Sequence, residues 1–180
     1  VAVHWTINAA GIIEMSMSTL RNPEFPDLPR FGLRLFLPEE MNQVTYYGLG
    51  PNESYADKHR SSSHGLYTSK VADMHEDYIR PQENGSHCDC DYVIVNGENT
   101  RLAFVSSSPF AFNASPYTQE ELTKKAHNYE LETSGNTVLC IDYAHNGIGS
   151  NSCGPKLLDP YRFNEERFFF NIKVYPSLAR

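Results

Sequence analysis

The sequence predicts an all-β protein of antiparallel strands with one short helix. Short apolar runs recur along the chain, several of them alternate apolar with polar residues, and glycine, proline or asparagine stands between them. One segment alone carries a strong helix-start signal. About ten short strands with one helix are typical of an antiparallel β-sandwich.

The first third of the chain is expected to form four strands. Two of them lie in His4–Leu20 around a turn at Asn8–Gly11, and Ile13–Thr19 alternates apolar with polar residues. Phe31–Leu37 alternates in the same way, and Gln43–Tyr47 resumes as a strand after a break. A period of two indicates a sheet with one face in contact with water.

The middle third is expected to combine loops with a hairpin. Gly48–Lys58 is interpreted as a loop, and its glycines lack the spacing of a phosphate-binding motif. His59–Asp77 is polar and weakly patterned. Cys90–Asn96 predicts a strand that an Asn-Gly turn joins to Arg101–Val105, and Phe110–Asn113 predicts a further short aromatic strand.

The last third holds the predicted helix and two strands. Thr118–Glu121 fits a capping box, in which the Thr118 hydroxyl accepts from the Glu121 amide and the Glu121 side chain reaches back. The helix is expected to end near His127 and Asn128. Thr137–Ile141 then predicts a strand, and Arg167–Tyr175 predicts the final one, which a proline ends.

Length and charge limit the classes of function. The 180 residues are enough for one domain, expected to span residues 1–180, and the net charge of −7 argues against nucleic acid and anionic membranes as partners. The longest apolar runs cover a few residues, so no bilayer-spanning segment is predicted. The chain opens without a methionine or a signal peptide and inside a predicted strand, which favours an excised or processed piece.

The cysteines indicate a reducing compartment. A chain of this size does not need disulfides, and Cys140 stands in an apolar run, as a buried thiol would. We therefore expect reduced thiols and a cytoplasmic location. Trp5, the single tryptophan, is expected in the core.

The loop after the strand at Thr137–Ile141 is the candidate binding surface. It is rich in glycine and in small polar residues, and loops placed by rigid strands carry many binding residues. Its candidate residues are His145, Asn146, Asn151, Ser152 and Cys153. No complete catalytic set appears there or elsewhere, so we predict no catalytic residue in the chain.

Other clusters favour a structural interpretation. In a strand, Cys88 and Cys90 would share one face, and His87, Asp89 and Asp91 the other, which divides the possible metal ligands. We predict no metal site. Cys153 and His145 could pair as nucleophile and base, but the glycines between them do not fix the position of one side chain relative to the other. The adjacent acids Glu39–Glu40, Glu120–Glu121 and Glu165–Glu166 point apart and are interpreted as solvated surface.

Five motifs in register resemble a known family. They are Leu28–Gly32, Tyr46–Asp57, Arg80–Gly85, Phe112–Leu122 and Asp142–Pro155. Together they resemble the C-terminal small-chain domain of family 2 β-galactosidases over nearly the whole chain. The resemblance implies an antiparallel supersandwich of the galactose mutarotase-like type, from which an N-terminal part is missing here.

The resemblance also implies a function. In the family, two glutamates on a separate (β/α)8 barrel cleave the galactoside, and the small-chain domain packs against that barrel. The implied role here is to help close the pocket for galactosides such as lactose, with Asn151, Ser152, Cys153, His145 and Asn146 lining it, and without activity alone. Glu83 and Asn84 are expected to support these lining residues from the side that faces away from the pocket.

The implied partners are the remaining domains or large subunit of an oligomeric enzyme, together with the galactoside substrate. No cofactor is expected in this chain, and any magnesium or sodium of the parent enzyme would be bound elsewhere. Some family members place a tryptophan under the sugar where this chain has Cys153, and a thiol offers no stacking surface.

Two other functions stay open. A stand-alone carbohydrate-binding module or aldose mutarotase could use the same architecture, and a mutarotase needs an acid and a base that flank one sugar ring. Candidates for these groups are His64, His87, His127, His145 and Glu83, and the sequence alone brings no pair together. The third function is that of a purely structural interaction domain.

Overall fold

Antiparallel strands form most of the computed structural model, which describes residues 1–149 and 156–178. The strands of this part are β1 (Ala2–Ile7), β2 (Ile13–Leu20), β3 (Arg30–Pro38), β4 (Gln43–Gly50), β5 (Ser63–Lys70), β6 (Ser86–Asn96), β7 (Thr100–Ser115), β8 (Asn136–His145) and β9 (Arg167–Leu178). The helices are α1 (Gln119–Lys124) and the short 3-10 turns η1 (Val71–Met74), η2 (Asn128–Glu130) and η3 (Asp159–Tyr161). The predicted all-β antiparallel class with one short α-helix is confirmed, and the supersandwich stays a prediction.

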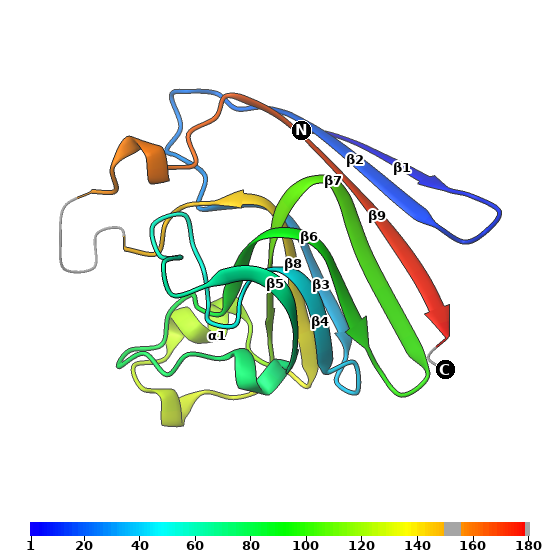
Figure 1. Cartoon of the computed structure of the whole chain (residues 1–180). Helices are drawn as coiled ribbons and strands as arrows, with labels where there is room; N and C mark the ends of the chain where they lie inside the picture. Colours follow the sequence, from blue (N-terminus) through cyan, green and yellow to red (C-terminus); the bar gives the residue numbers. More distant parts are fainter. Residues whose placement is uncertain (150–155, 179–180) are drawn as a thin grey trace.

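The sheet is organised around the long strand β7. Its main path runs β1-β2-β9-β7-β6-β4-β5, and β8 joins β7 on one side and β3 on the other. The first half of β7 pairs with β9 through Thr100–Val105, whereas its second half pairs with β8 through Ala111–Ser115. Figure 1 shows the result: β1, β2 and β9 run together toward one side, and β3, β8, β6, β4 and β5 curve around the other.

The core lies on the apolar face of this curved sheet. In several strands the period-two pattern puts alternate side chains on that face, as with Met15 and Met17 in β2. The largest side chains that are fully buried come from several strands, and include Tyr46, Phe104, Phe112 and Ile141.

The first hairpin forms where predicted, but its tryptophan is not in the core. Asn8 accepts from the amides of Ala10 and Ile12 through its side chain, which closes the turn between β1 and β2. Trp5 lies opposite Met15 on the apolar side, yet it is 52% exposed. The expectation of a core position is wrong because β1 is the edge of the sheet and all its residues are exposed.

Several strands extend beyond their predicted bounds. β4 continues to Gly50, in the segment expected to be a loop, and β9 continues past Pro176 to Leu178. β5 lies in the segment without a predicted element, because an edge strand buries little apolar surface and gives a weak pattern. Arg101–Val105 and Phe110–Asn113 belong to one strand, which remains continuous through small polar residues while it changes neighbour from β9 to β8.

The helix α1 begins as predicted and ends early. The Thr118 hydroxyl accepts from the Glu121 amide at 3.1 Å, so the cap is confirmed. The Glu121 side chain does not complete a capping box: it accepts from the Glu132 amide at 3.0 Å and pairs with Lys125. The helix ends at Lys124, because the backbone of Lys125 is extended and its amide donates to the Glu121 carbonyl.

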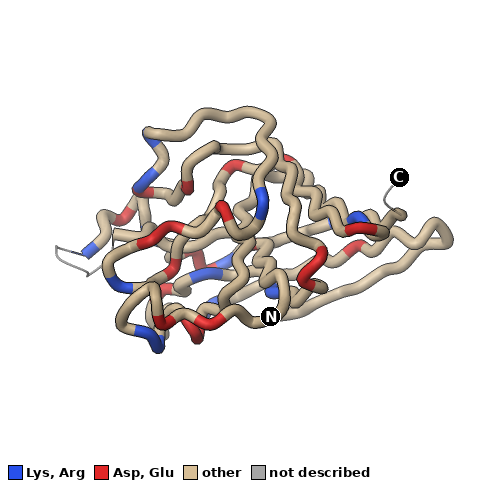
Figure 2. The backbone as a smooth tube through the Cα atoms, turned by 90° about the horizontal axis from the view of Figure 1, so that it is seen from below, with Lys and Arg blue, Asp and Glu red and all other residues tan. Residues whose placement is uncertain are grey.

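Charged residues are distributed over the chain. Figure 2 shows Lys and Arg positions among Asp and Glu positions along the backbone. Many form ion pairs, such as Arg34 with Glu120 and Arg162 with Asp27. The helices in the described part of the chain are too short and too polar to cross a lipid bilayer.

Candidate functional site

The five sequence motifs meet around one pocket at the end of β8. We call it the Arg30 pocket; its volume is about 550 Å³, and its lining includes Arg30, Tyr55, Glu83, Gln119, His145, Asn146 and Ile148. These residues come from segments up to about 120 positions apart in the sequence, so the fold alone brings them together. The pocket is the strongest candidate site in the described residues because predicted pocket residues and buried charges converge there.

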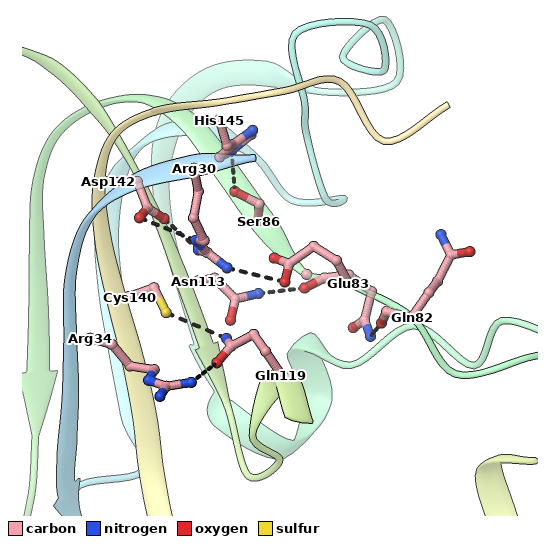
Figure 3. Close-up of polar contacts among 12 residues, drawn as sticks. Arg30, Arg34, Gln82, Glu83, Ser86, Asn113, Gln119, Cys140, Asp142 and His145 are labelled. Carbon is pink, nitrogen blue, oxygen red and sulfur yellow. Dashed lines mark hydrogen bonds and ion pairs between the residues drawn. The ribbon is translucent and has the colours of Figure 1, made fainter. Parts of the chain in front are cut away.

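The pocket is centred on an arginine held by two carboxylates. Figure 3 shows Arg30 of β3 between Asp142 of β8 and Glu83 of a loop. Its Nε and Nη2 atoms donate to the two carboxylate oxygens of Asp142 at 3.3 and 2.5 Å, and Nη1 donates to Oε2 of Glu83 at 3.1 Å. Two parallel bonds to one carboxylate fix the plane of the guanidinium as well as its position.

A glycine in β3 permits this arrangement. The register between β3 and β8 shifts between Phe31 and Gly32, and a Cβ atom at Gly32 would lie 2.6 Å from the Asp142 Cα atom. Only a residue without a side chain fits so close to β8. The bulge therefore lets the two strands approach where Arg30 binds Asp142.

Burial and charge shift the pKa values of this group. Burial alone would lower the pKa of Arg30, but Asp142 and Glu83 outweigh it, so the guanidinium stays charged. Burial raises the pKa of the Glu83 carboxyl, and Arg30 offsets part of that rise. Asp142 is 2% exposed, and its charge is balanced by Arg30 inside the protein.

His145 lies beside this group with both ring nitrogens engaged. Nδ1 lies 3.1 Å from the carbonyl oxygen of Asn146, which can only accept, so Nδ1 carries a proton. Nε2 lies 2.9 Å from the Ser86 hydroxyl. Burial lowers the pKa of His145, and the nearby Asp142 carboxylate opposes this in part. The imidazole is therefore neutral near pH 7 and fixed in one orientation.

The first residues after β8, Asn146 to Gly149, are held in place by hydrogen bonds to other segments. The side chain of Asn146 donates to the carbonyl of Leu28 at 3.0 Å and accepts from the amide of Phe163 at 2.6 Å. Asp57 accepts from the amides of Ile148 and Gly149 through its two oxygens, each at 2.9 Å. The rim of the Arg30 pocket is thus held from three parts of the chain.

Two buried polar residues, Glu53 and Asn84, hold the segment that carries Glu83. Glu53 accepts from the Gly85 amide at 2.7 Å and from Lys58 at 2.5 Å, and also from the Tyr78 hydroxyl. Asn84 accepts from the Glu76 amide at 3.0 Å and donates to the Gln82 carbonyl at 2.9 Å. These contacts fix the segment that carries Glu83.

The predicted site residues divide into three groups. His145, Asn146 and Glu83 line the Arg30 pocket. Asn84 is 5% exposed and supports the wall from behind it. Asn151, Ser152 and Cys153 lie outside the described residues.

Arg30 and Asp142 were missed by the sequence reasoning. The position of Asp142 could have indicated a buried ion pair, because it directly follows the apolar run Val138–Ile141. An acid that is buried with such a strand rarely lacks a partner of opposite charge. Arg30 stood in a quoted motif, but no pattern in the sequence pairs it with residues so far away.

The His87–Asp91 cluster is not arranged as its alternation predicted. The register of β6 shifts on both sides of Cys90, and Asp89 has a positive φ of 51°, so His87 and Cys90 are both buried whereas Asp89 and Asp91 are exposed. No group of three or more metal-ligating side chains is found in residues 1–149 and 156–178.

Comparison with known proteins identifies relatives over nearly the whole chain. A sequence profile described as "Beta galactosidase small chain" matches residues 1–174. A protein of Actinobacillus pleuropneumoniae named beta-galactosidase is 51% identical over 166 residues, which are 92% of this chain and 16% of that protein. Proteins of the same name from Staphylococcus xylosus and Lactococcus lactis are 40% and 36% identical over 95% and 90% of this chain, and over 17% and 16% of their own lengths. The chain thus spans about a sixth of the length of these relatives.

Proposed function

The chain belongs to the beta-galactosidase small-chain family, and we propose that it is the C-terminal part of a β-galactosidase that helps to close the galactoside pocket. It packs against a catalytic domain and supplies one wall of the pocket, while the catalytic glutamates are carried by that other domain. The family match over residues 1–174, together with relatives about six times as long, carries this proposal.

The contacts of the carboxylates in the pocket support the proposal that the catalytic glutamates lie on another domain. A retaining glycosidase needs one carboxyl group as nucleophile and another as acid, both free to reach the scissile bond. Asp142 is buried and Glu83 is bound by the same arginine, so neither is placed as an independent acid or nucleophile. The chain therefore contributes a wall of the galactoside pocket and hydrogen-bonding groups, and no catalytic carboxylate.

The pinned rim supports a role at an interface. His145, Asn146 and Ile148 stand on a loop whose backbone is fixed by Asp57 and by the segment before β3. A fixed loop at the mouth of a pocket can meet a substrate without losing much conformational entropy.

Reconstitution with a relative tests the proposal. The Actinobacillus pleuropneumoniae protein would be produced without the C-terminal sixth that matches this chain, and then mixed with it. We expect no hydrolysis of a chromogenic galactoside by either piece and clear hydrolysis by the mixture. The relative's own C-terminal piece is the positive control. Hydrolysis by this chain alone, or a complex that forms without activity, would refute the proposal.

Substitutions in the loop separate a pocket wall from a scaffold. In the reconstituted enzyme, Asn151→Ala and Cys153→Ala should change KM for the galactoside, because these residues are proposed to line its pocket. A scaffold alone would leave KM and kcat unchanged.

A further inference from the structure

Cys88 of β6 and His145 of β8 lie together in the wall of a second pocket. We call it the Cys88 pocket; its volume is about 310 Å³, and its lining includes Leu49, His59, Cys88, Asp89, Phe110 and His145. The Cys88 Sγ atom lies 3.8 Å from the His145 Nε2 atom, although the two residues are 57 positions apart. The cluster His87–Asp91 offers no metal site by itself, but the fold adds a histidine to it from another strand.

The hydrogen bonds of His145 prepare its Nε2 atom to act as a ligand. Nδ1 donates its proton to the Asn146 carbonyl at 3.1 Å, so Nε2 has the free electron pair. Such a contact is typical of metal-binding histidines, because it fixes the ring and makes the other nitrogen more basic. Nε2 also lies 2.9 Å from the Ser86 hydroxyl (Figure 3), which has a second acceptor in the Phe112 carbonyl at 3.4 Å. The hydroxyl can therefore turn to Phe112 when Nε2 binds an ion.

The surroundings of the Cys88 thiol favour a cation. The thiol is free and half-buried, and it donates to the Ser54 carbonyl at 3.2 Å. Burial raises its pKa to about 12, and a hydrogen bond to Ser54 lowers the pKa in part. Three carboxylates raise the pKa further, namely those of Asp89, Asp142 and Asp57. A bound cation would be attracted by the same negative charges that oppose a bare thiolate.

The separation of the two atoms fits two ligands of one ion. Thiolate sulfur and imidazole nitrogen bind a metal such as zinc at about 2.3 and 2.0–2.1 Å, and with these lengths a separation of 3.8 Å gives an angle of about 120° at the ion. Within the part of the chain that the structure describes, no third His, Cys, Asp or Glu joins the pair. Zinc and calcium sites need more protein ligands than two. Cu⁺ and Ag⁺ accept two or three ligands, and soft thiolate ligands select Cu⁺.

We propose that Cys88 and His145 form a binding site for a soft monovalent metal ion, such as Cu⁺, in the wall of the Cys88 pocket. Binding breaks the S–H bond of Cys88 and forms a sulfur–metal bond, and the proton passes to the solvent. His145 is already neutral and contributes the electron pair of Nε2, so no electron is transferred. The site goes beyond the proposed function, because it needs neither a galactoside nor a partner domain.

Titration of the purified chain with Ag⁺ in chloride-free buffer tests this site, because Ag⁺ shares the ligand preference of Cu⁺ and needs no reductant. Every protein carries Cys153→Ser, which removes the cysteine outside the described residues. Calorimetry should show a single tight site, with release of about one proton per ion. The Nε2 signal of His145 should shift in NMR spectra, and Mg²⁺ should have no effect. Absence of saturable binding, or an Nε2 signal that does not respond to Ag⁺, would overturn the proposal.

Two variants locate the ligands. Cys88→Ser should weaken Ag⁺ binding on the order of a hundredfold and His145→Gln on the order of tenfold, since the thiolate is the preferred ligand. Cys140→Ser and His59→Gln are the matched controls and should bind as the parent does. Cys140 is a buried thiol that accepts from Gln119, and His59 lines the same pocket as Cys88.

The melting temperature of each variant without Ag⁺ is measured first. The NMR signal of His145 in the protein with Cys88 intact identifies one ligand even where a variant does not fold. Binding that Cys88→Ser leaves unchanged, or that Cys140→Ser weakens as much, would place the ion elsewhere and end the proposal. Equal affinity for Zn²⁺ and Ag⁺ would also end it, because it would indicate a site with more protein ligands.

Discussion

Arg30 binds the buried carboxylate of Asp142 through two nitrogens across the β3–β8 pair. Removing one partner of a buried pair leaves an uncompensated charge, which costs about 3–5 kcal/mol. Arg30→Met should therefore lower the free energy of unfolding, measured by urea denaturation, by that amount. Arg34→Met is the matched control on the same strand: its partner Glu120 is exposed, so we expect a loss of about 1 kcal/mol or less.

A double variant sharpens this test. Arg30→Met with Asp142→Leu replaces both partners by apolar groups and should recover much of the loss. Equal losses for Arg30→Met and Arg34→Met would contradict the buried character of the pair.

Asp57 and Gly147 are predicted to be coupled. A Cβ atom at Gly147 would lie 2.6 Å from each carboxylate oxygen of Asp57. Gly147→Ala should therefore destabilise the chain, and should cost at least 1 kcal/mol less in an Asp57→Ala background, where the clash is absent. The measurement is a double-mutant cycle of unfolding free energies. Gly65→Ala combined with Asp57→Ala is the additive control, and additivity at Gly147 would refute the clash.

Much of the sheet could be predicted because one face of several strands is buried. The alternation around Met15 and Met17 is a direct consequence of that burial. Trp5 shows the limit: its place on the apolar side follows from the pattern, but its burial depends on what covers an edge strand. Likewise β5 was missed because its neighbour on one side is solvent.

The site was predictable in part. The loop at His145 and Asn146 follows from the local contrast between an apolar strand and a glycine-rich segment. The Arg30 contacts with Glu83 and Asp142 could not be predicted, because they join positions 53 and 112 residues apart. Only the three-dimensional path of the strands brings these groups together.

We predict no mutarotase activity. Of the acid and base candidates, His145 and Glu83 do line one pocket, but His145 has both nitrogens in hydrogen bonds and Glu83 is bound by Arg30. Glu83 keeps one oxygen without a donor, but both nitrogens of His145 are occupied, so these two groups do not form an acid and base pair. Fresh α-galactose should therefore change its optical rotation at the buffer rate in the presence of the chain. Faster rotation that Glu83→Gln abolishes would contradict this and favour an aldose mutarotase.

The stability of the chain is predicted to fall in mild acid through His87. This residue is 2% exposed, stacks on Phe112, and its Nδ1 atom lies 3.0 Å from the Leu49 carbonyl. Burial lowers its pKa from 6.5 to about 4, and the Leu49 backbone and Glu53 oppose this only in part. Below pH 6.5 His87 binds a proton in the unfolded chain, whereas in the folded chain it binds one only near pH 4. Stability is therefore complete above pH 6.5 and falls as the pH drops toward 4, by about 3 kcal/mol from this residue.

His87→Gln removes the titrating group and keeps a side-chain donor for Leu49. Between pH 6.5 and pH 4 its unfolding free energy should decrease less than that of the parent by up to about 3 kcal/mol, with a smaller slope left from His145, whose pKa is also lowered. His127→Gln, at an exposed position, should keep the parent's slope. NMR titration of the His87 ring in the parent gives a check that needs no variant. A ring that titrates near pH 6.5 in the folded chain would refute the prediction, because a histidine with an ordinary pKa cannot link folding to pH in this range.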